Sequence, residues 1–314
     1  MVQNSKWLEG SSPGDLASRA GRHALKARLE LVWHYFPLAA DEAHTDAETV
    51  HQLRISTRRA EAALRSYRPF LPPRRAKWFD KQLKRIRQAA GTIRDADVML
   101  TRLSGQMEDR PDPAWKALLK KLRLERREAQ APLVELQHKL ARKDFPHRAA
   151  RLVKRVRLRE TELGNEPTFG EVARDVLQHL AAEFLSAGES ELADIAALHQ
   201  FRILGKRLRY ALELFAAAFD ARLRTDVYPL VEQVQEQLGH INDHATAIDR
   251  FRGWLDAWQD PVVSGPLTEL IAGEERALAT SREQFFAWWT PDRLDDLRRR
   301  FEDLLTSPIV GRVA

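Results

Sequence analysis

Two stretches of the sequence carry histidine and basic side chains at matching spacing. HQLRISTRRAEAALRSY covers residues 51–67, and HQFRILGKRLRYALELF covers residues 199–215. A fixed row of cations beside an imidazole can hold an anion, because guanidinium and ammonium groups donate charge-assisted hydrogen bonds. The matched pairs are His51 with His199, Arg54 with Arg202, Ile55 with Ile203, Arg58 with Lys206 and Arg59 with Arg207.

A second pair of motifs keeps the same offset as the histidines. GTIRDADV begins at Gly91 and GHINDHAT begins at Gly239, so the offset is 239 − 91 = 148, equal to 199 − 51 = 148 for the histidines. Two motifs at one shared offset indicate the duplication of a large unit. A glycine inside a helical pattern also predicts close approach by another helix or a ligand.

Helical periodicity separates each basic stretch into two faces. At 100° per residue, the apolar residues of each stretch fall on one side and the basic residues on the other. The basic faces hold His51, Arg54, Arg58 and Arg65 in the first copy and His199, Arg202, Lys206 and Arg209 in the second. We expect the apolar faces to pack, and the repetition of the basic faces favours an anionic ligand over a merely solvated surface.

Positive charge is concentrated elsewhere in the chain as well. Residues 74–87 contain seven Lys or Arg and one Asp, and residues 142–159 contain eight and one. Such concentration predicts a polyanionic partner: a nucleic acid, a membrane surface or a phosphate polymer. Further basic stripes are Arg19, Arg22, His23 and Lys26 on one expected helix, and Lys77, Lys81, Lys84 and Arg87 on another.

Composition limits the chemistry and the compartment. The 314 residues include no cysteine, which excludes disulfides, thiolate catalysis and a cysteine-type zinc site. The first residues do not form a signal peptide, and no apolar stretch approaches the roughly 18 residues that a membrane-spanning helix needs. The sequence therefore predicts a cytoplasmic protein without membrane insertion.

The whole chain is expected to be all-α. No segment alternates polar and β-branched residues as a strand would. We predict two four-helix bundles related by a pseudo-two-fold axis. The expected bounds are a disordered N-terminus over 1–14, a first bundle over 15–160 and a second over 161–314. The expected helices are 15–36, 50–68, 74–107, 113–143, 169–187, 191–219, 222–257, 265–289 and 291–305.

These motifs resemble the CHAD domain, the conserved histidine α-helical domain. HQLRISTRR and HQFRILGKRLRY, each followed 40 residues after its histidine by a Gly-x-x-[Arg/Asn]-Asp element, carry the resemblance, which covers about residues 15–290. It implies two helical bundles around a basic pore or groove that binds inorganic polyphosphate without catalysis or cofactor. It is also compatible with targeting to polyphosphate granules.

Carried over by position, the resemblance assigns polyphosphate binding to both basic helices. The implied residues are His51, Arg54, Arg58 and Arg59 in the first half, and His199, Arg202, Lys206, Arg207 and Arg209 in the second. Lys81, Lys84 and Arg87 are added as pore-facing residues, together with the stripe of Arg19, Arg22, His23 and Lys26.

The two halves are not equivalent in charge. Glu232 and Glu236 stand in the second half near positions that are lysine in the first, and Asn242 replaces Arg94. We expect the second-half cations to be partly neutralised and the first half to contribute more affinity. The Glu-x-Glu-x-Lys strand of the triphosphate tunnel domains that often accompany this family is absent from the sequence, so their hydrolase or cyclase chemistry is not implied.

Two rival functions remain open from the residues. Backbone binding of nucleic acid needs the same cations, although base stacking would need aromatic residues on the basic faces, where only Tyr210 lies near. His240, Asp243 and His244 have the spacing of a metal chelate on one helix face, which would suit a metal-dependent phosphate-ester or polyphosphate hydrolase. We favour pairing of Asp95 and Asp243 with arginines across helices, with no metal bound and no catalytic residue.

The histidines lie among cations, which disfavours their protonated form. A bound polyanion would favour it, so each histidine can serve as a neutral donor at high pH and as an added charge at low pH. We also expect the two histidine-bearing helices to face one another across a basic cavity.

Overall fold

The computed structural model confirms an all-α protein. It describes residues 5–41, 46–107, 112–158, 166–190, 192, 194–259 and 261–307, and within these ranges the only β pairing is an isolated bridge between Leu16 and Thr168. The helices are α1 (Ala17–Ala40), α2 (Ala47–Ser66), α3 (Pro73–Met107), α4 (Pro113–Glu128), α5 (Gln130–Arg142), α6 (Phe145–Val153), α7 (Phe169–Glu189), α8 (Ile195–Phe215), α9 (Tyr228–Trp258), α10 (Pro261–Trp288) and α11 (Pro291–Thr306). Shorter helical turns lie at Arg68–Phe70, Ala216–Ala218 and Leu223–Val227.

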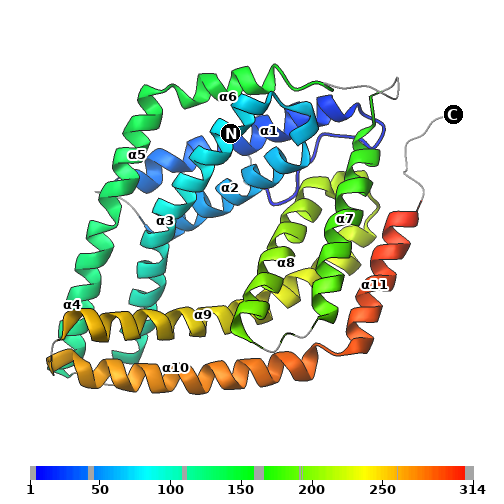
Figure 1. The fold of residues 1–314 in the computed structure, drawn as a ribbon. Helices are drawn as coiled ribbons and strands as arrows, with labels where there is room; N and C mark the ends of the chain where they lie inside the picture. The colour runs from blue at the N-terminus through cyan, green and yellow to red at the C-terminus, as the bar shows by residue number, and fades with distance from the viewer. Residues whose placement is uncertain are drawn as a thin grey trace.

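The helices of the two halves are arranged alike. In the first half α2 packs between α1 and α3, and in the second half α8 packs between α7 and α9. The halves meet where α2 contacts α8, where α1 contacts α7 and where α4 contacts α10. In Figure 1, α2, α3, α9 and α8 follow one another around the middle of the molecule. The boundary expected near residues 160–161 lies outside the described residues.

The apolar residues form one large core and one small core. The large core takes residues from both halves, including Phe36 and Tyr67 from the first and Phe184 and Phe215 from the second. The small core lies where α3 and α9 extend away from the large one and meet α4 and α10. The halves therefore do not fold around separate cores, because the faces of α2 and α8 are buried in a common one.

Capping residues fix where several helices begin. The Asp46 side chain accepts a hydrogen bond from the Thr49 amide at 2.5 Å, and Asp194 accepts one from Ala197. Thr168 and Glu171 form a reciprocal capping box at the start of α7. These caps place α2, α7 and α8, the helices that meet at the boundary between the halves.

Two helices differ from the bounds expected from the sequence. Pro37 does not end the first helix, which continues to Ala40 because Ala39 and Ala40 are buried and the Gln130 side chain donates to the Ala39 carbonyl at 2.8 Å. The helix expected over 113–143 is divided at Ala129. Pro132 lacks the amide that would continue the hydrogen-bond ladder there. The basic segment 142–159 contains a further helix, α6, in which Phe145, Ala149 and Leu152 are buried.

The N-terminal segment is ordered from residue 5, so the expectation of disorder over 1–14 is wrong for residues 5–14. Arg28, only 3% exposed, donates to the carbonyls of Ser5 and Lys6 at 3.0 and 2.9 Å. Trp7 packs edge-on against Tyr228, and the Leu8 amide points at the Glu213 carbonyl at 3.4 Å. A buried guanidinium needs acceptors, and this segment supplies them. Residues 1–4 lie outside the described residues.

Among the described residues, no helix combines the length and the apolar composition required to cross a bilayer.

Candidate functional site

Four basic side chains meet where α2 contacts α8, and we call them the seam cluster: Arg54 and Arg58 from α2, Arg202 and Lys206 from α8. Each of Arg58, Arg202 and Lys206 lies close enough to the others and to Arg54 for their charges to interact. The two basic faces predicted from periodicity therefore do face one another across the boundary between the halves.

The seam cluster is partly withdrawn from water. Arg54 and Arg202 side chains are 20% and 16% exposed, and the buried Nε of Arg202 has no hydrogen-bond partner among the described residues. Burial lowers the pKa of Arg58 and Arg202, and the neighbouring cations lower them further. The same two causes lower the pKa of Lys206 to about 6. Concentrated positive charge held partly away from water is suited to an anionic ligand.

Two carboxylates orient the arginines from the flanking helices. Arg54 donates to Asp95 on α3 at 3.0 Å, and Arg202 lies 3.9 Å from Asp243 on α9. Because 202 − 54 and 243 − 95 both equal 148, these contacts correspond under the internal offset and support the duplication. Both carboxylates are more than half exposed. The predicted pairing of Asp95 and Asp243 with arginines is confirmed.

The two motif glycines differ in their surroundings. Arg54 donates to the Gly91 carbonyl at 3.1 Å, and its guanidinium lies 3.8 Å from where a Cβ at Gly91 would be. A Cβ at Gly91 would therefore make only an ordinary van der Waals contact, and the contact with Arg54 does not by itself require a glycine. At Gly239 nothing among the described residues lies within 4 Å of that position.

His51 and His199 lie near the starts of α2 and α8, the two helices that carry the seam cluster. Burial and the nearby Arg94 lower the pKa of His51, as expected for a histidine among cations. His199 is exposed, and its Nδ1 lies 2.8 Å from Oδ1 of Asn242. Residues 94 and 242 also differ by 148, so each histidine meets the side chain at the same internal position. The change from Arg94 to Asn242 thus replaces a charge by a neutral hydrogen-bond partner.

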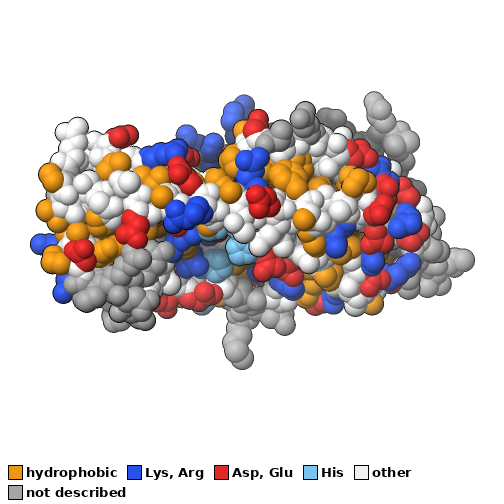
Figure 2. Space-filling model, turned by 90° about the horizontal axis from the view of Figure 1, so that it is seen from below, with side chains coloured by type: hydrophobic (Ala, Val, Ile, Leu, Met, Phe, Trp, Pro, Cys, Tyr) orange, Lys and Arg blue, Asp and Glu red, His pale blue; other side chains and the backbone are white. Residues whose placement is uncertain are grey.

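The basic surface continues along α2 and α8 beyond the seam cluster. Arg65 and Arg207 border a pocket of about 410 Å³ between α2, α7 and α8, together with His179 and Asp175. Arg207 forms an ion pair with Glu183 at 3.2 Å. On the face seen in Figure 2, the surface is hollowed near its middle, and Lys, Arg and His side chains lie in the hollow.

Arg59 and Arg209 lie in a separate buried network rather than in the seam cluster. Arg59 donates to the fully buried Glu213 at 2.7 Å, and Arg209 approaches the same carboxylate at 3.3 Å. The Tyr228 hydroxyl also donates to Glu213, at 2.9 Å. A buried carboxylate needs this compensation, so these two arginines serve the fold. The resemblance assigned both to polyphosphate binding, and the structure does not bring them into the seam cluster.

Glu232 does not neutralise the second half of the seam cluster. Its carboxylate lies 3.7 Å from Arg209 and 3.9 Å from Lys6, and it accepts from Tyr228. The expected partial neutralisation therefore reaches Arg209 of the second half, but among the described residues Glu232 forms no ion pair with Arg202 or Lys206. A difference remains, because Lys206 with its lowered pKa takes the place of Arg58.

Among the described residues, the basic stripe of α1 makes its contacts away from the seam cluster. Arg22 donates to the Val156 carbonyl at 2.9 Å, and His23 contacts the Glu9 carbonyl at 2.7 Å. Arg19 is exposed beside Asp15, and Lys26 is exposed. These contacts turn Arg22 and His23 toward α6 and the N-terminal segment, so the structure does not bring this stripe into the predicted site.

The three α3 residues predicted to face the pore, Lys81, Lys84 and Arg87, differ in how near they lie to the seam cluster. Arg87 pairs with Glu61 at 3.1 Å and lies close enough to Arg58 to affect its pKa. Lys81 and Lys84 are exposed and lie opposite the buried side of α3. Arg87 thus borders the seam cluster, whereas the two lysines follow the outer surface.

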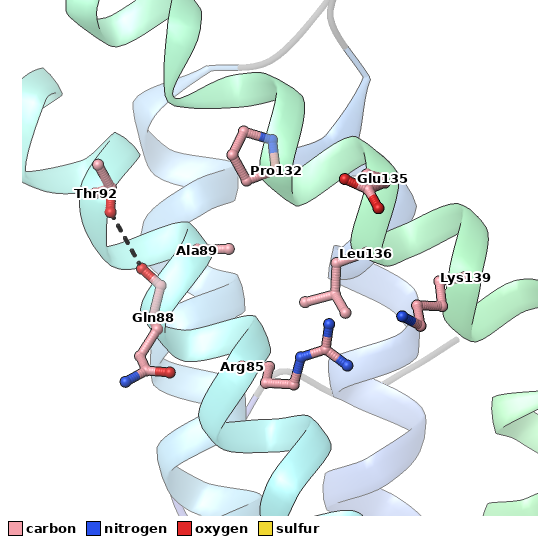
Figure 3. A pocket seen from close by; sticks show the side chains of 8 residues that line it. All are labelled: Arg85, Gln88, Ala89, Thr92, Pro132, Glu135, Leu136 and Lys139. Carbon is pink, nitrogen blue, oxygen red and sulfur yellow. Dashed lines mark hydrogen bonds between the residues drawn. The ribbon is translucent and has the colours of Figure 1, made fainter.

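A separate pocket of about 380 Å³ lies between α3 and α5 (Figure 3). Arg85 and Lys139 bring positive charge to it, and Glu135 brings a carboxylate. Mixed charge makes it a poorer polyanion site than the seam cluster.

The three residues with chelate spacing on α9 do not come together as a metal site. His244 lies 2.7 Å from the buried Glu274 on α10, which also pairs with Arg102 at 2.7 Å. Asp243 instead faces Arg202. Among the described residues, no group of three or more His, Cys, Asp and Glu side chains has a metal-binding arrangement.

Three neighbours of the site were named from the sequence but not assigned to binding. Arg94 acts on His51, Tyr210 is buried beside Arg58, and Arg65 borders the pocket at the far end of α2. Arg65 was identified on the basic face of the first stretch but not assigned to binding. Tyr210 was identified near a basic face, but its contact with Arg58 belongs to the other half and has no signal in the sequence.

Comparison with known proteins gives the class of the fold. The profile of the CHAD domain family matches residues 23–252, and the chain belongs to this family. The crystal structure of the CHAD domain from the plant Ricinus communis matches with a TM-score of 0.68 and 22% identity, covering 96% of each chain. PptA from Streptomyces chartreusis matches with a TM-score of 0.64 and 18% identity, covering 88% of this chain and 99% of that one. No curated protein matches the sequence.

Proposed function

We propose that this protein binds inorganic polyphosphate at the seam cluster without chemically changing it. The observation that carries the proposal is the meeting of Arg54, Arg58, Arg202 and Lys206 from two helices that are distant in sequence. Membership of the CHAD family supports the choice of polymer.

The chemistry of the cluster suits an unbranched phosphate polymer. Polyphosphate presents only charged oxygens, so a site for it needs cations in a row and little else. Guanidinium groups bond two oxygens at once, and Asp95 and Asp243 hold two of them in place.

A nucleic-acid backbone would use the same cations but gains little here from its bases. Tyr210 is buried, and the guanidinium of Arg209 covers its ring at 4.8 Å. A base stacks only on an accessible aromatic face. We therefore expect polyphosphate to displace single-stranded RNA of equal charge.

The test is a titration with polyphosphates of defined length at two salt concentrations. With about four phosphate contacts, affinity should fall by about 50-fold between 50 and 200 mM salt. Arg54→Ala with Arg58→Ala should weaken binding about 100-fold, since hydrogen bonds to charged groups contribute about 1.5–3 kcal/mol each.

The matched control is Lys120→Ala with Arg123→Ala on the exposed face of α4, which removes the same charge away from the seam. Equal losses from the two double variants would show that only net charge matters and would overturn the proposal.

A further inference from the structure

The basic run that follows α5 in the sequence forms a surface that the seam cluster does not use. Arg148, Arg151 and Arg155 lie within about 60° of one another on the exposed side of α6 and the turn after it. Arg75, at the start of α3, lies close enough to all three for their charges to interact. We call these four residues the outer arginine patch.

The outer arginine patch carries uncompensated charge. Among the described residues, none of the four arginines has an Asp or Glu oxygen within 4.0 Å. Loss of hydration and repulsion by Arg155, Arg151 and Arg148 lower the pKa of Arg75. A protein surface normally intersperses carboxylates among its cations, so four arginines together predict an anionic partner.

One arginine of the patch is held in place. The Nε of Arg148 donates to the Lys143 carbonyl at 2.7 Å, and its guanidinium lies 5.1 Å from the centre of the Trp78 ring. Its terminal nitrogens therefore remain available for a ligand. This cation–π contact links the patch on α6 to Trp78 of α3.

The surroundings favour a phosphate chain over a base or a bilayer. Arg148 lies over the Trp78 ring and Phe145 packs at 6.0 Å from it, so the ring offers no free platform for a base. The apolar residues of α6, Phe145, Ala149 and Leu152, are buried in the protein and cannot insert into lipid.

The helix α3 connects the patch to the seam cluster. Arg87, which borders Arg58, lies twelve residues after Arg75. This spacing is about 18 Å along the axis of α3. Between them Lys77, Lys81 and Lys84 are exposed on one side of α3. At 100° per residue, the three lysines lie around the α3 axis between the direction of Trp78 and the direction of Arg87.

We propose that the outer arginine patch is a second binding segment for the same phosphate polymer, reached from the seam cluster along the lysines of α3. This inference rests on the proposed function. A short chain would occupy the seam cluster alone, and a long chain would occupy both. Joining two contacts by one polymer raises affinity through effective concentration, so the patch should matter only for long chains.

The test compares two quadruple variants with matched loss of charge. One is Arg75→Gln, Arg148→Gln, Arg151→Gln and Arg155→Gln. The control is Lys116→Gln, Lys120→Gln, Arg123→Gln and Arg127→Gln, all exposed on α4. Dissociation constants are measured for a short and a long polyphosphate at one salt concentration, after thermal unfolding has confirmed that both variants are folded.

We expect the patch variant to lose at least tenfold in affinity for the long chain and less than threefold for the short one. The control should lose less than threefold for both. Equal losses for the long chain in the two variants would overturn the second segment, as would equal losses for short and long chains in the patch variant. Failure of the wild type to bind the short chain would instead overturn the proposed function.

Discussion

At the scale of single residues, Lys206 is the one amine among the three guanidinium groups of the seam cluster. It faces Arg54 and Arg58 on α2, Arg202 on its own helix and Asp243 on α9. Among the described residues no carboxylate lies within ion-pair distance of it. Its amine is therefore mostly neutral at pH 7 in the free protein, because its pKa is lowered to about 6.

Polyphosphate binding should consequently take up a proton. A polyanion favours the ammonium form and raises the pKa of Lys206, so binding above pH 6 adds a proton to it. By linkage, affinity should fall as the pH rises from 6 toward 8. Calorimetry at pH 7.5 in two buffers of different ionisation enthalpy measures the uptake. Lys206→Arg keeps the charge at all these pH values, and an uptake as large as that of the wild type would contradict the assignment.

The same residue predicts unequal halves. Arg54→Ala with Arg58→Ala should cost about 1–2 kcal/mol more binding free energy at pH 7.5 than Arg202→Ala with Lys206→Ala, because the wild-type ammonium must first be formed. Titration of both double variants at one salt concentration measures the difference. At pH 5.5 the difference should shrink, and equal losses at both pH values would show that the halves contribute alike.

At the scale of elements, the buried carboxylate of Glu213 joins helices from both halves. It contacts Arg59 on α2, Arg209 on its own helix and Tyr228 at the start of α9. Leu8 of the N-terminal segment lies against the backbone of the same residue. Removing one partner of a buried charge network leaves the others uncompensated.

Glu213→Gln should therefore destabilise the fold by about 3–5 kcal/mol, since two arginines would lose their buried counter-charge. Glu232→Gln provides the control, because Glu232 is about half exposed and such pairs contribute about 0–1 kcal/mol. Urea unfolding at pH 7.5 measures both. A change below 1 kcal/mol for Glu213→Gln would mean that the network does not hold the halves together.

At the scale of the whole molecule, the protein has two apolar cores. The large core lies beneath the helices of the seam cluster, and the small core lies at the far ends of the long helices α3 and α9. The large core includes Leu64 of α2, and the small core includes Leu118 of α4, each fully buried. The small core closes the structure where α3 and α4 meet α9 and α10. With fewer buried apolar residues, this region should open more readily than the rest.

Leu118→Ala should lower the local stability of this closing region, by about 2–5 kcal/mol for a buried leucine. Hydrogen exchange should show lost protection in α4, α10 and the ends of α3 and α9, with α2 and α8 unchanged. Leu64→Ala, of the same type and burial, should lower protection throughout. Identical exchange patterns in the two variants would show that the cores unfold as one unit.

The sequence by itself determined the helical class, the internal repeat and the position of the basic faces, because these depend on periodicities within single helices. It also identified the residues that form the seam cluster. Arg54 and Arg58 repeat as Arg202 and Lys206 at fixed spacing, on surfaces opposite to apolar ones.

Only the tertiary structure decided which cations are available. Arg59 and Arg209 look equivalent to their neighbours in sequence, yet both are paired with the buried carboxylate of Glu213. Likewise Arg75 and Arg148 are far apart in the chain, and the packing of α6 against α3 brings them together. The physical reason is that a charge acts through its distance to other charges and its exposure to water, and contacts between separate helices set both.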